Sequence, residues 1–226
     1  IAVRLHDSAP DLVCATLYLF NRNHSLDILQ RLKITRPECL IAVGGPECLD
    51  AEAARLLAQY PFLDFALHGE AEAGLPPLLN AIAAERAGRP VTDQIPDLLA
   101  AVPGLAWRQG PRIIDNGGAA FSSAWTAPPP CQSPFFAADK PFAQLETSRG
   151  CPFQCTYCTS GNTPLRLKPL AAVAAELRLL HAAGIRDVRL LDRTFNIDPK
   201  RTIDLLRLFK EDFPDVHFHL EIHPHL

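Results

Sequence analysis

Three cysteines in the second half of the chain, Cys151, Cys155 and Cys158, lie close enough in the sequence to serve one metal centre. They form the pattern C-x3-C-x2-C in the segment RGCPFQCTYC, directly after an expected strand. Thiolates bind iron–sulfur clusters and zinc. A ferredoxin-type cubane uses four cysteines, so three would leave one iron open, as a catalytic metal centre requires. A structural zinc site and a chance group of buried thiols are the alternatives.

The composition limits the class of protein. The 226 residues are 48% hydrophobic and 21% charged, with a formal net charge of −3, which predicts a soluble chain of one or two domains. No apolar run reaches the roughly 18 residues of a membrane helix, so no membrane partner is expected. Nucleic acid is not indicated either, because Lys+Arg 22 stand against Asp+Glu 25. Seven cysteines without a secretion signal favour a cytoplasmic protein with thiol or metal chemistry.

Short apolar runs alternate with amphipathic stretches in the first part of the chain. We expect strands at 11–20, 39–43 and 62–68, and helices at 24–35, 50–59 and 73–87. This rhythm predicts an α/β unit with a Rossmann-like, doubly wound parallel sheet, whose loops at the carboxyl ends of the strands would hold a ligand. A small hairpin is expected over 102–115.

A proline-rich segment, 121–141, is predicted to be an extended linker. The β/α pattern then returns, with strands expected at 142–148, 188–191 and 217–222 and helices at 168–183 and 198–213. Three strands cannot close a barrel, so this part is predicted to be an incomplete β/α (partial TIM) barrel. Because the chain lacks Met and opens on Ile1, we also expect it to be a fragment of a longer protein.

The cysteine motif resembles the signature of the radical S-adenosylmethionine (SAM) superfamily, C-x3-C-x-aromatic-C, with Tyr157 in the aromatic position. The preceding segment ETSRG and the pair Pro152-Phe153 resemble the subgroup with an N-terminal cobalamin-binding domain. Upstream, the segments Gly44-Gly45-Pro46 and GEAE at 69–72 resemble the GGP and GE-x-E loops of that domain, with Ala71 where the family usually has glycine.

The resemblance implies a cobalamin-binding-type domain over 1–120, a linker over 121–141 and the N-terminal part of a radical SAM barrel over 142–226. It implies a 4Fe-4S cluster on Cys151, Cys155 and Cys158, with SAM on the fourth iron. Reductive cleavage of SAM would start hydrogen abstraction or, with cobalamin, methyl transfer on an unknown substrate. An electron donor of the flavodoxin or ferredoxin type is implied as a partner.

Further residues are carried over from the resemblance. Tyr157 would lie by the adenine of SAM, and Asp192 and Thr194 of the segment DRTFN fall where the family binds the SAM amino group. Asp192 could instead be a loop residue before the next helix. Gly44, Gly45 and Pro46 would form the cobalamin-type loop, or simply a tight turn between strand and helix. No Asp-x-His-x-x-Gly motif occurs, so cobalamin binding stays open.

The last expected strand, VHFHLEIH, alternates apolar residues with His217, His219, Glu221 and His223. In a β/α barrel the apolar side packs on the helices, so the His/Glu side should face inward. Glu221, near the carboxyl end of the strand, is therefore a candidate for contacts with SAM or substrate. Two other functions stay open for the whole chain: a non-catalytic cofactor-binding module and a structural zinc protein.

Overall fold

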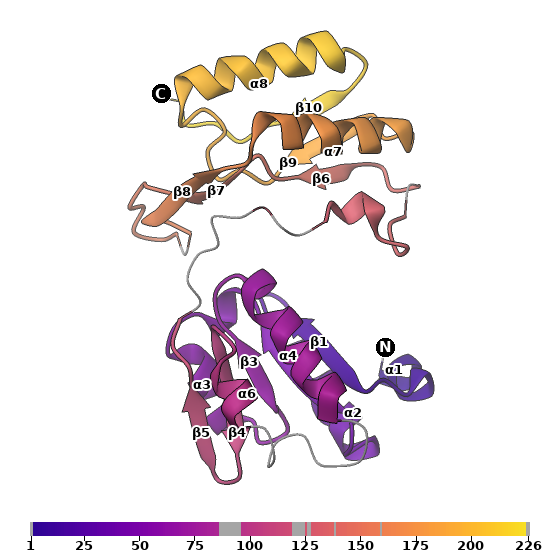
Figure 1. The fold of residues 1–226 in the computed structure, drawn as a ribbon, viewed down its shortest axis with the longest axis vertical. Coiled ribbons are helices and arrows are strands. Elements are labelled where there is room, and N and C mark those ends of the chain that lie inside the picture. Colours follow the sequence, from indigo (N-terminus) through magenta and orange to yellow (C-terminus); the bar gives the residue numbers. More distant parts are fainter. Residues whose placement is uncertain are drawn as a thin grey trace. The chain divides into compact units, whose positions relative to one another are not determined.

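The computed structural model describes residues 2–85, 96–118, 125, 128–137, 139–158 and 160–224 (Figure 1). The chain divides into two compact units, residues 1–122 and 123–226. Each unit has its own hydrophobic core. Within the described ranges, no helix is long and apolar enough to cross a membrane.

The N-terminal unit contains a sheet with the strand order β1-β2-β3-β4-β5. Its strands are β1 (Leu12–Thr16), β2 (Leu40–Gly44), β3 (Phe65–Leu67), β4 (Leu105–Gln109) and β5 (Arg112–Asp115). The first three are parallel, and β4 and β5 are antiparallel additions to the same sheet. The predicted α/β unit with parallel strands is confirmed, and so is the hairpin, but the hairpin makes the sheet mixed.

Helices cover both faces of this sheet. These helices are α2 (Arg22–Thr35), α3 (Glu52–Gln59), α4 (Ala71–Glu85) and α6 (Pro96–Ala100), whereas α1 (Ala2–Ser8) contacts α2. Along β2, Ile41 and Val43 pack with α2 and α3, whereas Ala42 packs with α4 and α6. Successive residues of a strand point to opposite faces, which explains why β2 is apolar throughout.

The strand order differs from the predicted doubly wound order. The described strands follow one another in consecutive order across the sheet, without the reversal that defines a doubly wound fold. Such a reversal needs a strand on the far side of β1, and β1 is the edge among the strands described here.

Gly45 fixes the turn after β2. Its φ is +94°, a conformation that glycine adopts readily and other residues rarely do. A β-carbon there would lie 2.6 Å from the Thr16 Cγ2 atom and 2.9 Å from the Leu17 carbonyl oxygen. The same carbonyl accepts a hydrogen bond from the Glu47 N–H at 3.2 Å. The Gly44-Gly45-Pro46 loop is therefore held tightly against the loop that follows β1.

The C-terminal unit consists of β/α units. Strands β6 (Ala143–Leu145), β9 (Asp187–Leu190) and β10 (His217–His219) form a parallel sheet in the order β10-β9-β6. Helices α7 (Leu170–Ala182) and α8 (Pro199–Asp212) connect them and contribute to one core cluster with the sheet (Figure 1). The described strands form an open sheet and no closed barrel.

Two expected strands differ in extent. The strand predicted at 142–148 is two strands in different sheets: β6 ends at Leu145, and β7 (Ser148–Cys151) pairs antiparallel with β8 (Thr163–Leu167), which was not predicted. The chain turns because Thr147 and Ser148 bind Asp192 instead of extending β6. β10 ends at His219 rather than at residue 222.

The segment predicted as a linker lies partly outside the described residues. In its described part, a short 3-10 helix spans Pro130–Gln132, and Cys131 and Phe136 pack against the core of the C-terminal unit. Trp125 lies against Arg149 and Lys168, with the Arg149 guanidinium 4.9 Å from the ring centroid. These residues of the expected linker therefore pack on the C-terminal unit.

We expect Gly45→Ala to lower the free energy of unfolding of the N-terminal unit by about 1–3 kcal/mol, because it adds a clash to a strained backbone. Gly110→Ala is the matched control: Gly110 also has a positive φ, +55°, but a β-carbon there meets nothing within 4 Å. Urea denaturation followed by circular dichroism measures both. Equal losses for the two variants would contradict the close contact at Gly45.

Candidate metal and cofactor site

The three cysteines lie on the hairpin formed by β7 and β8. Cys151 ends β7, is 8% exposed, and its N–H donates to the Thr163 hydroxyl at 2.9 Å. Cys155 and Cys158 are exposed in the connecting loop, where the Cys158 N–H donates to the Cys155 carbonyl at 3.0 Å. All three are free thiols. The hairpin thus fixes one thiol at its base and presents the other two to solvent.

The hairpin strands approach each other closely at Gly150. This residue has φ +88°, and a β-carbon there would lie 2.0 Å from the Pro164 carbonyl oxygen. The β7–β8 register shifts between Arg149 and Cys151, next to this glycine. Only glycine fits here, so the path of the chain into Cys151 is set by the backbone of β8.

The donor set suits a cluster better than a single ion. Within the residues that the structure describes, no three His, Cys, Asp or Glu side chains form a group that could hold a metal ion. A structural zinc site takes four protein ligands, whereas a cubane with one open iron takes three thiolates. The three cysteines match the second number.

Asp192 ties the base of the hairpin to the parallel sheet. It lies just after β9 and is 2% exposed. Its carboxylate accepts hydrogen bonds from the Thr147 N–H at 2.7 Å, the Thr147 hydroxyl at 2.5 Å and the Ser148 hydroxyl at 2.7 Å. The structure thus places the predicted SAM residue inside the protein, with its acceptor atoms directed at the hairpin.

Arg201 binds the same base from the first turn of α8. Its Nη2 donates to the Thr147 carbonyl at 3.0 Å and also to the Lys168 carbonyl. Burial lowers the pKa of the Arg201 guanidinium from its usual value, and the charge of Asp192 opposes that shift. Lys168, in turn, forms an ion pair with Glu176 of α7. The Glu176 side chain is 5% exposed. Sequence reasoning found none of these partners, because they come from distant parts of the chain.

The cysteine loop, the segment after β9 and the end of β10 meet at one edge of the unit. The Phe153 ring of the loop stacks on His223, with the centroids 4.7 Å apart. The Asn196 side chain donates to the His223 carbonyl at 2.9 Å and accepts from its N–H at 2.8 Å. This is the carboxyl edge of the parallel strands, where α/β enzymes hold their ligands.

The other predicted residues of this unit lie near that edge with different exposure. Tyr157 is 90% exposed on the cysteine loop. Thr194 is buried, and its hydroxyl donates to the Arg193 carbonyl at 2.8 Å. Glu221 has an exposed side chain, and its carbonyl accepts from the Phe195 N–H at 2.8 Å. The predicted alternation holds within β10, where Phe218 packs on the core and the histidines are exposed, but it ends before Ile222, which is 63% exposed.

In the N-terminal unit, the Gly44-Gly45-Pro46 loop lies beside exposed apolar side chains. Leu19 and Phe20, in the loop after β1, are each 85% exposed, and the Phe20 ring stacks on Tyr18 with centroids 5.3 Å apart. Arg22 and Glu47 form an ion pair at 3.3 Å between the two loops. This edge therefore presents an apolar surface on a rigid turn.

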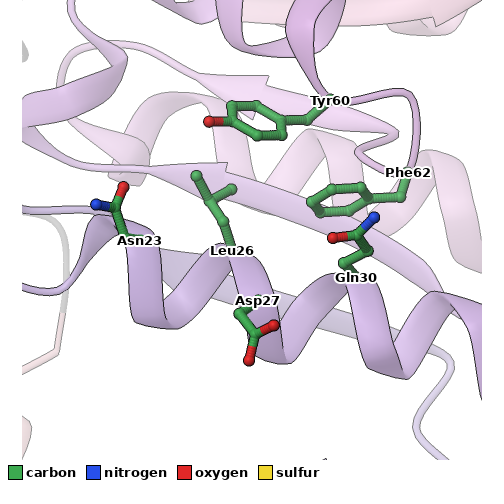
Figure 2. Close-up of a pocket in the computed structure, with 6 residues that line it drawn as sticks. All are labelled: Asn23, Leu26, Asp27, Gln30, Tyr60 and Phe62. Atoms are coloured by element: carbon green, nitrogen blue, oxygen red, sulfur yellow. The ribbon is translucent and has the colours of Figure 1, made fainter.

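A groove of about 190 Å³ lies elsewhere on the N-terminal unit. In Figure 2 the Tyr60 and Phe62 rings face Leu26 of α2, with polar side chains at the rim. Its lining consists of Asn23, Leu26, Asp27, Gln30, Tyr60 and Phe62. None of the residues predicted from the sequence to bind a cofactor lines this groove.

The thiol loop lies at the carboxyl edge of parallel β/α units, where proteins of this architecture hold their ligands. Residues 145–226 match the family described as Radical SAM superfamily. The match includes the cysteine motif, and the superfamily implies a 4Fe-4S cluster and SAM. The superfamily resemblance seen in the sequence is confirmed.

Several curated proteins are similar to most of this chain. The 2-(S-pantetheinyl)-carbapenam-3-carboxylate methyltransferase of Streptantibioticus cattleyicolor is 26% identical over 84% of this chain and 28% of its own length. The cobalamin-dependent radical SAM methyltransferase TokK of Streptomyces tokunonensis is 25% identical over the same shares, 84% and 28%. The hopanoid C-3 methylase of Methylococcus capsulatus is 28% identical over 78% and 33%. The chain thus spans a third or less of these relatives.

A solved structure shares the fold. The radical SAM methyltransferase TsrM from Kitasatospora setae, with tryptophan substrate and a SAM analogue bound, superposes with a TM-score of 0.71 and 18% identity. The match covers 98% of this chain and 46% of that protein. At this identity the likeness establishes the fold alone.

Thiol labelling tests the described placement of the cysteines. Burial raises the pKa of the Cys48 thiol to about 12, so at pH 8 only about one molecule in 10,000 carries the reactive thiolate there. In metal-free protein we expect iodoacetamide to label Cys155 and Cys158 at least about tenfold faster than Cys151 or Cys48. Peptide mass spectrometry over time measures the rates. Equal rates for Cys151 and Cys155 would contradict the placement of Cys151.

Proposed function

We propose that the intact protein is a radical SAM enzyme whose 4Fe-4S cluster is held by Cys151, Cys155 and Cys158. The observation that carries this proposal is the set of free thiols on one hairpin, within the residues that match the Radical SAM superfamily. SAM would occupy the fourth iron, and its cleavage would start hydrogen abstraction or cobalamin-assisted methyl transfer on a substrate that the sequence does not identify.

The chemistry that the cluster supplies when bound is one-electron reduction of SAM, and the chain's own residues position the reactants. Cys151 would anchor the cluster to the sheet, because it is the thiol within β7. We assign the exposed Tyr157 ring to the adenine of SAM. We assign Thr194 and Glu221 to the SAM or substrate side of the same edge. Asp192 is assigned to that edge too, but its acceptor atoms already bind the hairpin.

We assign residues 1–120 to a cobalamin-binding-type domain, with Gly44, Gly45 and Pro46 as its turn. Two findings support this assignment. A relative that matches 84% of this chain is described as cobalamin-dependent. The apolar side chains of Leu19 and Phe20 stand exposed beside the turn, where a flat cofactor could cover them. Because the Asp-x-His-x-x-Gly motif does not occur in the chain, cobalamin would bind without that histidine.

The electron donor is proposed to be a flavodoxin or ferredoxin, since radical SAM enzymes need a reductant. A cytoplasmic location is proposed for the same enzyme, because thiols that bind a cluster persist in a reducing compartment. A non-catalytic cofactor-binding module and a structural zinc protein remain the competing functions. The donor set argues against zinc, and the cluster-binding test below separates zinc from iron directly.

Replacing one ligand should abolish the cluster. We expect the full-length protein, reconstituted with iron and sulfide without oxygen, to hold about four iron atoms per chain and to absorb near 400 nm. Cys155→Ala should lose this absorbance, whereas Cys14→Ala, which removes another exposed thiol, should retain it. Iron, zinc and sulfide analysis measures both variants. Colourless wild-type protein with one zinc per chain would contradict the proposal.

Removing an apolar contact should weaken cobalamin binding. We expect Phe20→Ser to raise the dissociation constant for hydroxocobalamin about tenfold, because burial of a phenylalanine contributes about 1.5–3 kcal/mol. Ile34→Ser is the control: Ile34 is also exposed, but it lies at the other end of α2. Spectrophotometric titration measures both constants. Equal affinity in wild type and Phe20→Ser would show that Phe20 does not contact the cofactor.

A further inference from the structure

We propose that Asp192 and Arg201 are positioning residues that clamp both ends of the cysteine hairpin and thereby set the place of Cys151. The inference rests on the proposed function in one respect, namely that the hairpin carries the cluster ligands. It changes the role that the superfamily resemblance gave to Asp192, from a contact of SAM to a support of the ligand hairpin.

The clamp acts on the residues immediately outside the hairpin strands. Thr147 precedes β7, which begins at Ser148, and Lys168 follows β8, which ends at Leu167. The Lys168 N–H donates to the Thr147 carbonyl at 2.9 Å, so these two residues close the hairpin. Whatever holds Thr147 and Lys168 therefore holds both strands.

Asp192 holds the Thr147 side through its negative charge. Its carboxylate accepts the Thr147 N–H at 2.7 Å and the Ser148 hydroxyl at 2.7 Å. These hydrogen bonds fix the position of the hairpin, because a shift of the hairpin would leave buried donors without an acceptor, which costs free energy. Thr147 lies 45 residues and Ser148 lies 44 residues before Asp192 in the sequence, so the contact joins the segment after β9 to the hairpin.

Arg201 holds both sides at once through its positive charge. One guanidinium nitrogen, Nη2, donates to the Thr147 carbonyl and to the Lys168 carbonyl. Nη2 carries two N–H groups, one for each carbonyl, and a lysine side chain is one bond too short to place its ammonium at the same point. Arg201 is itself fixed at the start of α8, where its N–H donates to the Asp198 side chain at 2.9 Å.

Asp192 and Arg201 have opposite charges and act together on Thr147. Asp192 and Arg201 act on opposite polar groups of the same peptide residue, the N–H and the C=O of Thr147. Removing the Arg201 charge leaves the buried Asp192 carboxylate without that favourable interaction. Cys151 lies only three residues after Ser148 along β7. If the backbone of Thr147 and Ser148 becomes more mobile, the Cys151 thiol therefore becomes more mobile too.

The test uses metal-free full-length protein, so its readout does not depend on the cluster. The variants are Asp192→Asn and Arg201→Lys, with Asp187→Asn on β9 and Arg207→Lys on α8 as exposed, charge-matched controls. Iodoacetamide labelling of Cys151 and hydrogen exchange of the Thr147 amide are followed by mass spectrometry. We expect both rates to rise about tenfold in the two clamp variants and to stay unchanged in the controls.

A second readout separates positioning from general stability. In folded protein, as judged by circular dichroism, the labelling rate of Cys48 should stay constant while that of Cys151 rises. Unchanged protection of Cys151 in folded Asp192→Asn and Arg201→Lys would overturn the proposal. If neither variant folds, Ser148→Ala removes one donor to Asp192 and should raise labelling of Cys151 about threefold. An unchanged rate there would also overturn it.

Reconstitution with iron and sulfide distinguishes a failure of the proposed function from a failure of the clamp. Wild-type protein that protects Cys151 through the clamp but takes up no iron would contradict the proposed function and leave the clamp intact. Wild-type protein that takes up iron, beside clamp variants with the same iron content, cluster spectrum and Cys151 protection, would contradict the clamp and leave the proposed function intact.

Discussion

The buried carboxylate of Asp192 is the interaction on which the C-terminal unit depends most. It turns the chain out of the first parallel strand, because Thr147 and Ser148 bind it instead of continuing β6. Without that turn, the cysteines would follow a longer strand rather than a separate hairpin. The side chain is 2% exposed, and its oxygens accept hydrogen bonds from Thr147 and Ser148.

The two units present different surfaces at the carboxyl ends of their parallel strands. In the C-terminal unit this edge carries thiols, an exposed tyrosine and polar groups, which suit a metal cluster and a charged ligand. In the N-terminal unit it carries a tight glycine turn and exposed apolar side chains, which suit the face of a large, flat ring. The similar protein TokK is described as a cobalamin-dependent radical SAM methyltransferase.

Local patterns predicted what is encoded locally. The cysteine spacing, the strand and helix rhythm and the helix start at Asp198-Pro199 each depend on neighbouring residues, and the structure has these elements. The second hairpin strand, TPLRL, was missed because its proline and irregular burial do not resemble a strand. The clamp and the end of β10 depend on contacts between distant segments, such as Asn196 with His223, which no local pattern encodes. The consecutive strand order of the first sheet is likewise a tertiary property.

The central claim is that three thiols hold a cluster with one iron open to SAM. The most direct measurement is the electron paramagnetic resonance spectrum of the reduced, reconstituted full-length protein before and after SAM is added. The account predicts a 4Fe-4S signal whose shape and g values change with SAM, because SAM binds the iron that no cysteine occupies. A cluster signal that SAM leaves unchanged would contradict the account, since it would mean that the fourth iron is already liganded.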